Sequence, residues 1–413
     1  MRTSDHSTVA EFRRRHEAEI AELFDEVLGL CREAGLVSVG VITIDGTRIK
    51  ANASMDQKRC YREIVNEILR EAEDTDRRED ELYGHKRGDE LPDELRTPEG
   101  RRQALADAKR RIEERKGRPV NPRASDDQVV VDVEPLFTRT GGRREWLRLA
   151  RVEVERRRAL AAKPIPRDRE DRLFEAVRRI EEDHHVELRA NQDYERWRTT
   201  QRDTLGRVMK GNSKPYRPPN ILDSTINLVD PDSKVMRTKG LPPRQAYNAQ
   251  AVVTEQQIVV AAEVTVDAPD FGHLEPMVAK TLAHLDRHGV SERPGVVLGD
   301  AGYWHTRQIE QLTDQGLEVL VPPDGAMRDS GNRPGWEHER YERMRQKIRT
   351  EPGRTLYKLR KITIEPVYGQ IKYNRRIDHF TRRGRSAAHS EWRLVTATHN
   401  LLKLHTHWLA NPA

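Results

Sequence analysis

Three acidic residues occupy positions from which their side chains could meet at one point of the folded chain. Asp45 follows an apolar segment in IDGTRIKANAS, Asp300 follows another in VVLGDAGY, and Glu365 lies in a helical pattern in ITIEPVYGQIK. Side chains at strand ends and on a neighbouring helix can converge, and carboxylates are hard oxygen ligands that suit Mg²⁺ or Mn²⁺. Two such ions roughly 3.5–4 Å apart can activate a water or a 3′-hydroxyl in phosphodiester cleavage. We therefore predict that these three residues are catalytic and bind two Mg²⁺ or Mn²⁺ ions.

Another pair of acids competes for the first metal position. The sequence contains 68 Asp and Glu residues, and an Asp after a strand is more often a turn residue or a helix cap than a catalytic group. Asp230 and Asp232, in VDPDSK, are the competitors of Asp45. Because an Asp-Pro-Asp pattern more often shapes a turn before a strand, we favour Asp45.

Basic side chains accompany the third acid along the chain. Glu365 and Lys372 are seven residues apart, which is two helical turns, so we expect both on one face of a helix. Lys372 can then contact the phosphate beside the metal site. The alternative is a solvated helix face, but several cations lie together here. We predict DNA contacts for Arg360, Lys361, Lys372, Arg375 and Arg376.

Trp304 follows the second acid closely, in DAGYWHT, and is a candidate for DNA binding. A tryptophan can stack on an unpaired base, which contributes ~1–3 kcal/mol, although packing in the core is the commoner role. His405 and His407 form a His-x-His pair near the end of the chain. A phosphate-cleaving site prefers oxygen ligands, so we interpret both histidines as surface or packing residues.

The elements that must position these residues have the order of an α/β domain. Helical spacing of apolar residues predicts helices, and short β-branched segments predict strands. Without a long charged segment, the order of elements is close to that of an RNase H-like domain with a mixed sheet. The expected helices cover 7–34, 274–288, 305–315 and most of 354–408, and the expected strands cover 36–44, 246–253, 257–266, 295–298 and 318–321.

Residues 56–215 are different in kind, because Arg, Glu, Asp and Lys dominate and apolar residues are sparse. Their helical spacing predicts long exposed helices, with breaks at Gly84, Pro92 and 117–123 and a short strand over 129–133. We therefore expect a large charged helical insertion that interrupts the core. The predicted division is an N-terminal helix over 1–35, the first part of the core over 36–55, the insertion over 56–215, and the rest of the core over 216–408.

Composition suits a protein that approaches phosphates. Of the 413 residues, 74 are Lys or Arg, the formal net charge is +6, and only 5% are aromatic. Such a balance favours contact with nucleic acid. No apolar run approaches the ~18 residues that a membrane span needs, and the two cysteines, Cys31 and Cys60, have no CxxC spacing. We expect a cytoplasmic protein with reduced thiols and no membrane partner.

Five segments follow one another in an order that resembles one family. They are DHSTVAEFRRRH, IDGTRIKANAS, LVDPDSKVMRTKG with AYNAQAVV, VVLGDAGY, and YKLRKITIEPVYGQIKYNRR. In this order they resemble bacterial insertion-sequence transposases of the DDE class, and the resemblance extends from about residue 5 to residue 408. It implies an RNase H-like core and a metal triad of Asp45, Asp300 and Glu365, with the first acid in the DGT motif.

The resemblance also implies partners and a basic signature. The last segment is similar to a Tyr, Arg, Glu, Lys signature of the family, which Tyr357, Arg360, Glu365 and Lys372 would fill. One extra residue separates Arg360 from Glu365 relative to the commonest pattern, so Lys361 is an alternative for the basic role. The implied activity is metal-dependent DNA cleavage and strand transfer, with the element ends and target DNA as partners and a homodimer as the active form.

The front of the chain departs from this family. Its members usually carry a helical region before the DHST motif, whereas here that motif begins close to Met1. We therefore expect a copy that lacks its N-terminal region, in which the helix over 1–35 is a remnant of the DNA-binding part. Two other classes stay open, a catalytically silent DNA-binding relic or regulator of transposition, and a scaffold whose charged helices bind protein.

Overall fold

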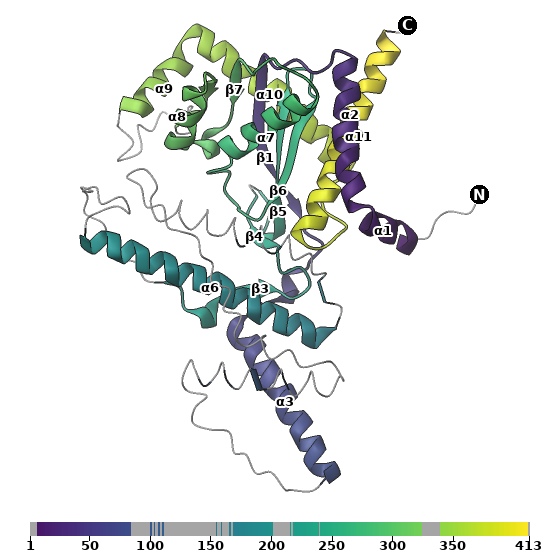
Figure 1. Ribbon diagram of the computed structural model, residues 1–413, viewed down its shortest axis with the longest axis vertical. Coiled ribbons are helices and arrows are strands. Elements are labelled where there is room, and N and C mark those ends of the chain that lie inside the picture. The colour runs from purple at the N-terminus through teal and green to yellow at the C-terminus, as the bar shows by residue number, and fades with distance from the viewer. Residues whose placement is uncertain are drawn as a thin grey trace. The chain divides into compact units, whose positions relative to one another are not determined.

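The computed structural model describes residues 6–83, 168–200, 218–323 and 339–411 except residue 239, with residue 215 and scattered positions between 100 and 166 (Figure 1). The chain divides into two compact units. The first joins Met1–Ser54 to Asp232–Ala413, and the second is Met55–Pro231. The predicted strand over 129–133 and the predicted breaks at Gly84, Pro92 and 117–123 lie outside the described residues.

A mixed sheet forms the centre of the first unit. Its strand order is β4-β5-β1-β7-β8, and β6 pairs with β5. The long strand β5 is antiparallel to β1, β4 and β6, whereas β7 is parallel to both β1 and β8. The predicted α/β fold with a mixed sheet is thereby confirmed. The strands are β1 Val41–Lys50, β4 Lys234–Met236, β5 Arg244–Thr254, β6 Val259–Thr265, β7 Val296–Leu298 and β8 Glu318–Leu320.

The first strand begins later than the sequence predicts. We expected a strand over 36–44 with Asp45 at its end, but β1 runs from Val41 to Lys50, and Asp45 lies inside it opposite Ala251. The second half of β1 alternates, with Thr47 and Ile49 buried and Arg48 and Lys50 less so. This period-2 pattern is that of a half-buried strand, and it carries the strand past Asp45.

Helices pack on the sheet and on one another. Helices α10 and α7 both contact β5, with α10 also on β1 and α7 on β6, while α11 lies against β6 and beside α2 (Figure 1). The buried apolar side chains of these helices and strands form one continuous core. The helices are α1 His6–Arg15, α2 Glu17–Glu33, α7 Leu274–Arg287, α8 Thr306–Asp314, α9 Glu339–Arg349, α10 Glu351–Gly369 and α11 Arg385–Ala410.

Two predicted helices are interrupted. The helix expected over 7–34 breaks at His16 into α1 and α2. The helical region expected over 354–408 divides into α10, a π-helical turn η5 over Gln370–Asn374, a loop and α11. The loop contains left-handed backbone at Arg376 (φ 54°) and Gly384 (φ 88°), which regular helices do not accept. This loop turns the chain so that α11 packs separately from α10.

The second unit has its own small core. Helices α3, Tyr61–Tyr83, and α6, Arg169–Thr200, accompany a two-stranded sheet of β2, Lys58–Cys60, and β3, Thr225–Asn227, with the 3-10 turns η1, Met55–Gln57, and η3, Ile221–Asp223. Among the described residues of this unit, apolar side chains of α3 and α6 pack together, as their helical spacing predicts. They include Ile64, Ile68, Leu173, Val177 and Ile180. Among the described residues, no helix is both long and apolar enough to cross a membrane.

Candidate functional site

Asp45 is a nearly buried carboxylate on the central strand β1. Its Oδ1 accepts a hydrogen bond from the backbone N–H of Gly46 at 2.8 Å, and its Oδ2 accepts one from Arg360 Nη1 at 3.1 Å. Burial, with a smaller contribution from the charge of Asp300, raises the pKa of Asp45 to about 7 against the opposing effect of Arg360. The fold therefore holds a carboxylate whose charge is not fully balanced.

Asp300 lies just beyond β7, as predicted, and caps the 3-10 turn η4, Ala301–Tyr303. Its Oδ1 accepts a hydrogen bond from the N–H of Gly302 at 2.7 Å. Burial is the main cause that raises the pKa of Asp300, and the charge of Asp270 adds to it. Because Asp300 in turn raises the pKa of Asp45, the structure brings these two acids together.

Glu365 lies on α10, as predicted, but it joins the other acids through Arg360. Its side chain is 53% exposed, and its Oε1 lies 3.8 Å from Arg360 Nη2. Arg360 also pairs with Asp45, so one guanidinium stands between the first and third acids. Tyr357 is half-buried and lies about one helical turn before Arg360. Burial raises the pKa of Tyr357, and the charge of Arg360 opposes this shift.

Asp270, which sequence reasoning missed, lies beside the two aspartates. It follows β6 in the loop before α7, and only 8% of it is exposed. Its Oδ1 accepts hydrogen bonds from Asn248 Nδ2 and Gln250 Nε2, both at 2.8 Å. Its charge raises the pKa of Asp45 and of Asp300. No motif or spacing signals Asp270, since its partners are 20 and 22 residues away on β5.

Two of the acids fit a divalent cation. Mg²⁺ in proteins is commonly held by one or two carboxylates and completed by waters and substrate phosphates. Asp45 and Asp300 offer such oxygen ligands, and the raised pKa of each, caused mainly by burial and in part by a neighbouring acid, shows that the ionised form is disfavoured, which a bound cation would relieve. Within the described part of the chain, however, no group of three His, Cys, Asp or Glu side chains is arranged to hold a metal ion. Asp45 and Asp300 therefore fit a divalent cation, whereas Glu365 lies next to Arg360.

Two of the side chains for which we predict DNA contacts, Lys372 and Arg375, form hydrogen bonds within the first unit. Lys372 Nζ donates to Thr47 Oγ1 at 3.0 Å and to the carbonyl of Arg48 at 3.3 Å. Arg375 Nη1 donates to the carbonyl of Val395 at 3.0 Å. Both side chains therefore connect the end of α10 to other elements of the first unit.

Trp304 requires a correction. It is 5% exposed, and its ring lies against that of Tyr341 with centroids 5.2 Å apart. The indole is part of the core and is not presented for stacking on a base. Lys361 and Arg376, by contrast, are exposed, and they remain available for phosphate.

Lys372 lies within a π-helical turn that follows α10, the helix that carries Glu365. The turn η5 covers Gln370–Asn374, and a π turn adds residues relative to an α-helical turn. The backbone between the two residues is therefore α-helical only as far as Gly369. Glu365 faces Arg360, whereas Lys372 reaches β1.

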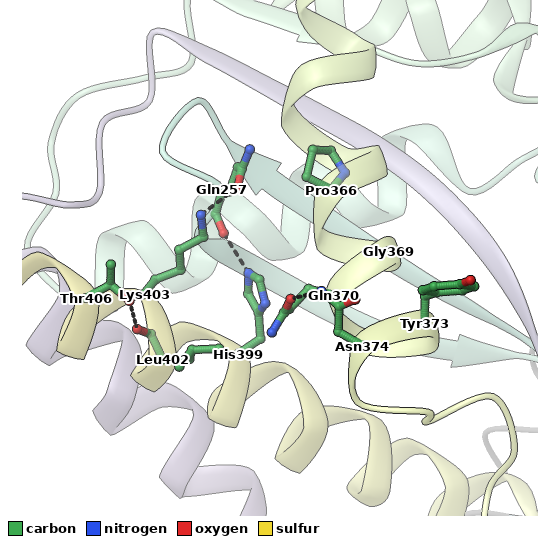
Figure 2. Close-up of a pocket in the computed structure, with 10 residues that line it drawn as sticks. All are labelled: Gln257, Pro366, Gly369, Gln370, Tyr373, Asn374, His399, Leu402, Lys403 and Thr406. Atoms are coloured by element: carbon green, nitrogen blue, oxygen red, sulfur yellow. Dashed lines mark hydrogen bonds between the residues drawn. The ribbon is translucent and has the colours of Figure 1, made fainter.

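A groove lies along the other side of α10. It has a volume of about 620 Å³ and is bounded by α10, η5, α11 and the turn between β5 and β6 (Figure 2). At its floor, His399 Nε2 lies 3.0 Å from the carbonyl oxygen of Gln257, and burial lowers the pKa of His399 to about 4. Lys403 also binds the Gln257 side chain, while Tyr373 stands at the rim, 86% exposed. The groove combines apolar and polar lining side chains, and its histidine is neutral at neutral pH.

Part of the chain is similar to a known protein family. Residues 221–401 match the family model described as transposase DDE domain. The matched region contains Asp270, Asp300 and Glu365, whereas Asp45 precedes it. Comparison with curated proteins and with solved structures gave no match. Over residues 221–401, this chain is therefore similar to the transposase DDE domain family.

Proposed function

We propose that this chain is a transposase that cuts DNA in a metal-dependent reaction and joins the cut strand to a target. Its family supports DNA as the partner and a divalent metal as the cofactor. The observation that carries the proposal is that Asp45, on the central strand β1, and Asp300, just after β7, are half-buried carboxylates with raised pKa values, and that the charge of Asp300 acts on Asp45.

We further propose that the core is RNase H-like. In support, the strands lie in the order β6-β5-β1-β7-β8, with β5 and β1 antiparallel and β7 and β8 continuing in parallel. Parallel neighbours place their carboxyl ends at one edge of a sheet, where ligands of α/β proteins commonly bind. Asp300 follows β7 at that edge. The proposed insertion, residues 56–215, lies between β1 and β4 along the chain.

In this proposal, Asp45 and Asp300 hold the cation through their side-chain oxygens. When bound, the metal would supply a more acidic water or 3′-hydroxyl and stabilise the leaving oxygen. Arg360 keeps Asp45 and Glu365 close to each other, and it offers two further donors to a phosphate. Lys361 and Arg376, which are exposed, would contact the DNA backbone and supply affinity that falls with salt.

Substitution of the acids separates cutting from binding. Asp45→Asn, Asp300→Asn and Glu365→Gln should each abolish Mg²⁺-dependent nicking of a plasmid that carries this gene and its flanking DNA. Their affinity for the DNA in a gel-shift assay should change little, because affinity comes mainly from Lys and Arg. The matched control is Asp314→Asn, on an exposed position at the end of α8, which should nick like the wild type.

Two results would contradict the proposal. Nicking by Asp300→Asn at the wild-type rate, or nicking by the wild type in EDTA, would remove the metal-dependent chemistry. Binding of the wild type to DNA with no nicking in Mg²⁺ or Mn²⁺ would instead favour the second hypothesis, a regulator that binds DNA without cutting it.

A further inference from the structure

Asp270 occupies space that two glycines leave open. A Cβ atom on Gly46 would lie 2.3 Å from Asp270 Oδ1, and a Cβ atom on Gly302 would lie 3.3 Å from Asp270 Oδ2. Gly46 is the residue after Asp45, and Gly302 donates its N–H to Asp300. The carboxylate of Asp270 therefore reaches from the segment that carries Asp45 to the segment that carries Asp300.

The carboxylate is fixed in this position by β5. Asn248 and Gln250 both donate to Oδ1, and Gln250 lies opposite Gly46 in the pairing of β5 with β1. The other amide atom of Gln250, Oε1, accepts a hydrogen bond from the hydroxyl of the buried Tyr303. Tyr303 belongs to the turn that Asp300 caps. One chain of contacts thus connects Asp270 to the backbone around both acids.

The charges around Asp45 and Asp300 indicate what Asp270 contributes to the site. The charges of Asp300 and Asp270 act on Asp45, the charge of Asp270 acts on Asp300, and the cations that oppose these effects include Arg360 and, at Asp300, Arg48. Asp270 Oδ1 already accepts hydrogen bonds from two amide groups. Its contribution would therefore be its negative charge and the position that it gives to the neighbouring backbone, rather than a bond to the metal. Carboxylates that sit behind the ligands of a metal commonly change metal affinity by about 10–100-fold when they are removed.

We propose that Asp270 is a positioning residue, which holds Asp45 and Asp300 at a common site and raises the affinity of that site for a divalent cation. This inference rests on the proposed function, because it takes Asp45 and Asp300 as the ligands. It assigns Asp270 no contact with the metal or with DNA.

A metal titration of the full chain without DNA tests the inference. Mn²⁺ binding would be measured by calorimetry or by the relaxation of water protons in wild type, Asp270→Asn, Asp45→Asn and a control, Asp286→Asn. Asp286 is an acid on α7 with a 55% exposed side chain that pairs with Arg293. We expect Asp270→Asn to weaken Mn²⁺ binding by about 10–100-fold, Asp45→Asn to abolish it, and the control to leave it unchanged.

The outcomes distinguish the inference from the proposed function. If Asp270→Asn binds Mn²⁺ like the wild type while Asp45→Asn does not bind, the inference is wrong and the proposed ligands stand. If Asp45→Asn binds like the wild type, the assignment of the ligands is wrong. The amide in Asp270→Asn retains an oxygen that can accept from Asn248 and Gln250, so folding should survive. If circular dichroism shows otherwise, Asp270→Ser removes the same charge with a smaller side chain, and wild-type affinity in that variant would equally overturn the inference.

Discussion

Asp45 is a carboxylate whose ionisation the fold opposes, and this opposition should be measurable as stability. Its pKa rises from 3.8 to about 7, and each pH unit corresponds to about 1.36 kcal/mol. The ionised side chain therefore costs about 4 kcal/mol of folding free energy above pH 7. We predict that Asp45→Asn stabilises the metal-free protein at pH 8, because the amide retains an acceptor for the N–H of Gly46 without the charge.

The stability that Asp45→Asn gains should be smaller than the free energy that ionising Asp45 costs the wild type. The variant also loses the ion pair between Asp45 Oδ2 and Arg360 at 3.1 Å, which offsets part of the stabilisation. For a unit of this size, about 1 kcal/mol corresponds to about 2–4 °C in Tm. A gain of several degrees is expected by differential scanning calorimetry at pH 8 in EDTA.

The pH dependence identifies the cause. A carboxyl group with a raised pKa in the folded state costs nothing below about pH 4, where it is protonated in both states, and its cost grows as pH rises to about 7. The advantage of Asp45→Asn should therefore shrink as pH falls from 8 to 4. Mg²⁺ should raise the Tm of the wild type and not that of the variant. Equal stabilisation at pH 4.5 and pH 8, or none at pH 8, would refute the reasoning.

Three further predictions follow from single contacts. Gly46→Ala should destabilise the fold by about 1–3 kcal/mol in urea titrations, because its Cβ atom would lie 2.3 Å from a carboxylate oxygen, whereas Gly369→Ala, with nothing within 4 Å, should be neutral or slightly stabilising. His399 resists protonation down to about pH 4, so stability should fall by about 3 kcal/mol as pH drops from 6.5 to 4, and His399→Gln should flatten that fall. Lys361→Ala with Arg376→Ala should reduce the log–log salt slope of duplex DNA binding by about 1.8, and an unchanged slope would show that neither side chain contacts phosphate.

The sequence predicts the elements of the core well where local patterns decide them. The two long strands over 246–253 and 257–266 and the helix over 274–288 are found close to their predicted bounds, because each has a clear period or a β-branched run. The bounds of β1 were wrong, since the apolar run before Val41 concealed the polar alternating half after Asp45. Apolar runs without alternation do not mark strand ends.

The candidate site was only partly predictable, because its geometry depends on contacts between distant residues. Asp45 and Asp300 could be proposed from strand ends and motifs. Asp270 could not, since its importance comes from two amides on β5 and from the missing Cβ atoms of Gly46 and Gly302. The π turn over Gln370–Asn374, which contains Lys372, was not indicated by the sequence, and the contacts of Lys372 with Thr47 and Arg48 join residues that are far apart along the chain.

The backbone segments that carry Asp45 and Asp300 differ in how extensively they are hydrogen-bonded to the rest of the sheet. Strand β1 is paired with β5 from Ile42 to Lys50, whereas Asp300 stands on a single 3-10 turn after the three-residue strand β7. Central strands exchange their amide hydrogens only when the whole domain opens, and short turns open locally. Amides around Asp45 should therefore exchange at the rate of global unfolding, and that of Gly302 far sooner. The two halves of the site should therefore open at different rates. Mild denaturant should release the turn that carries Asp300 first and disable cation binding while the sheet is still intact.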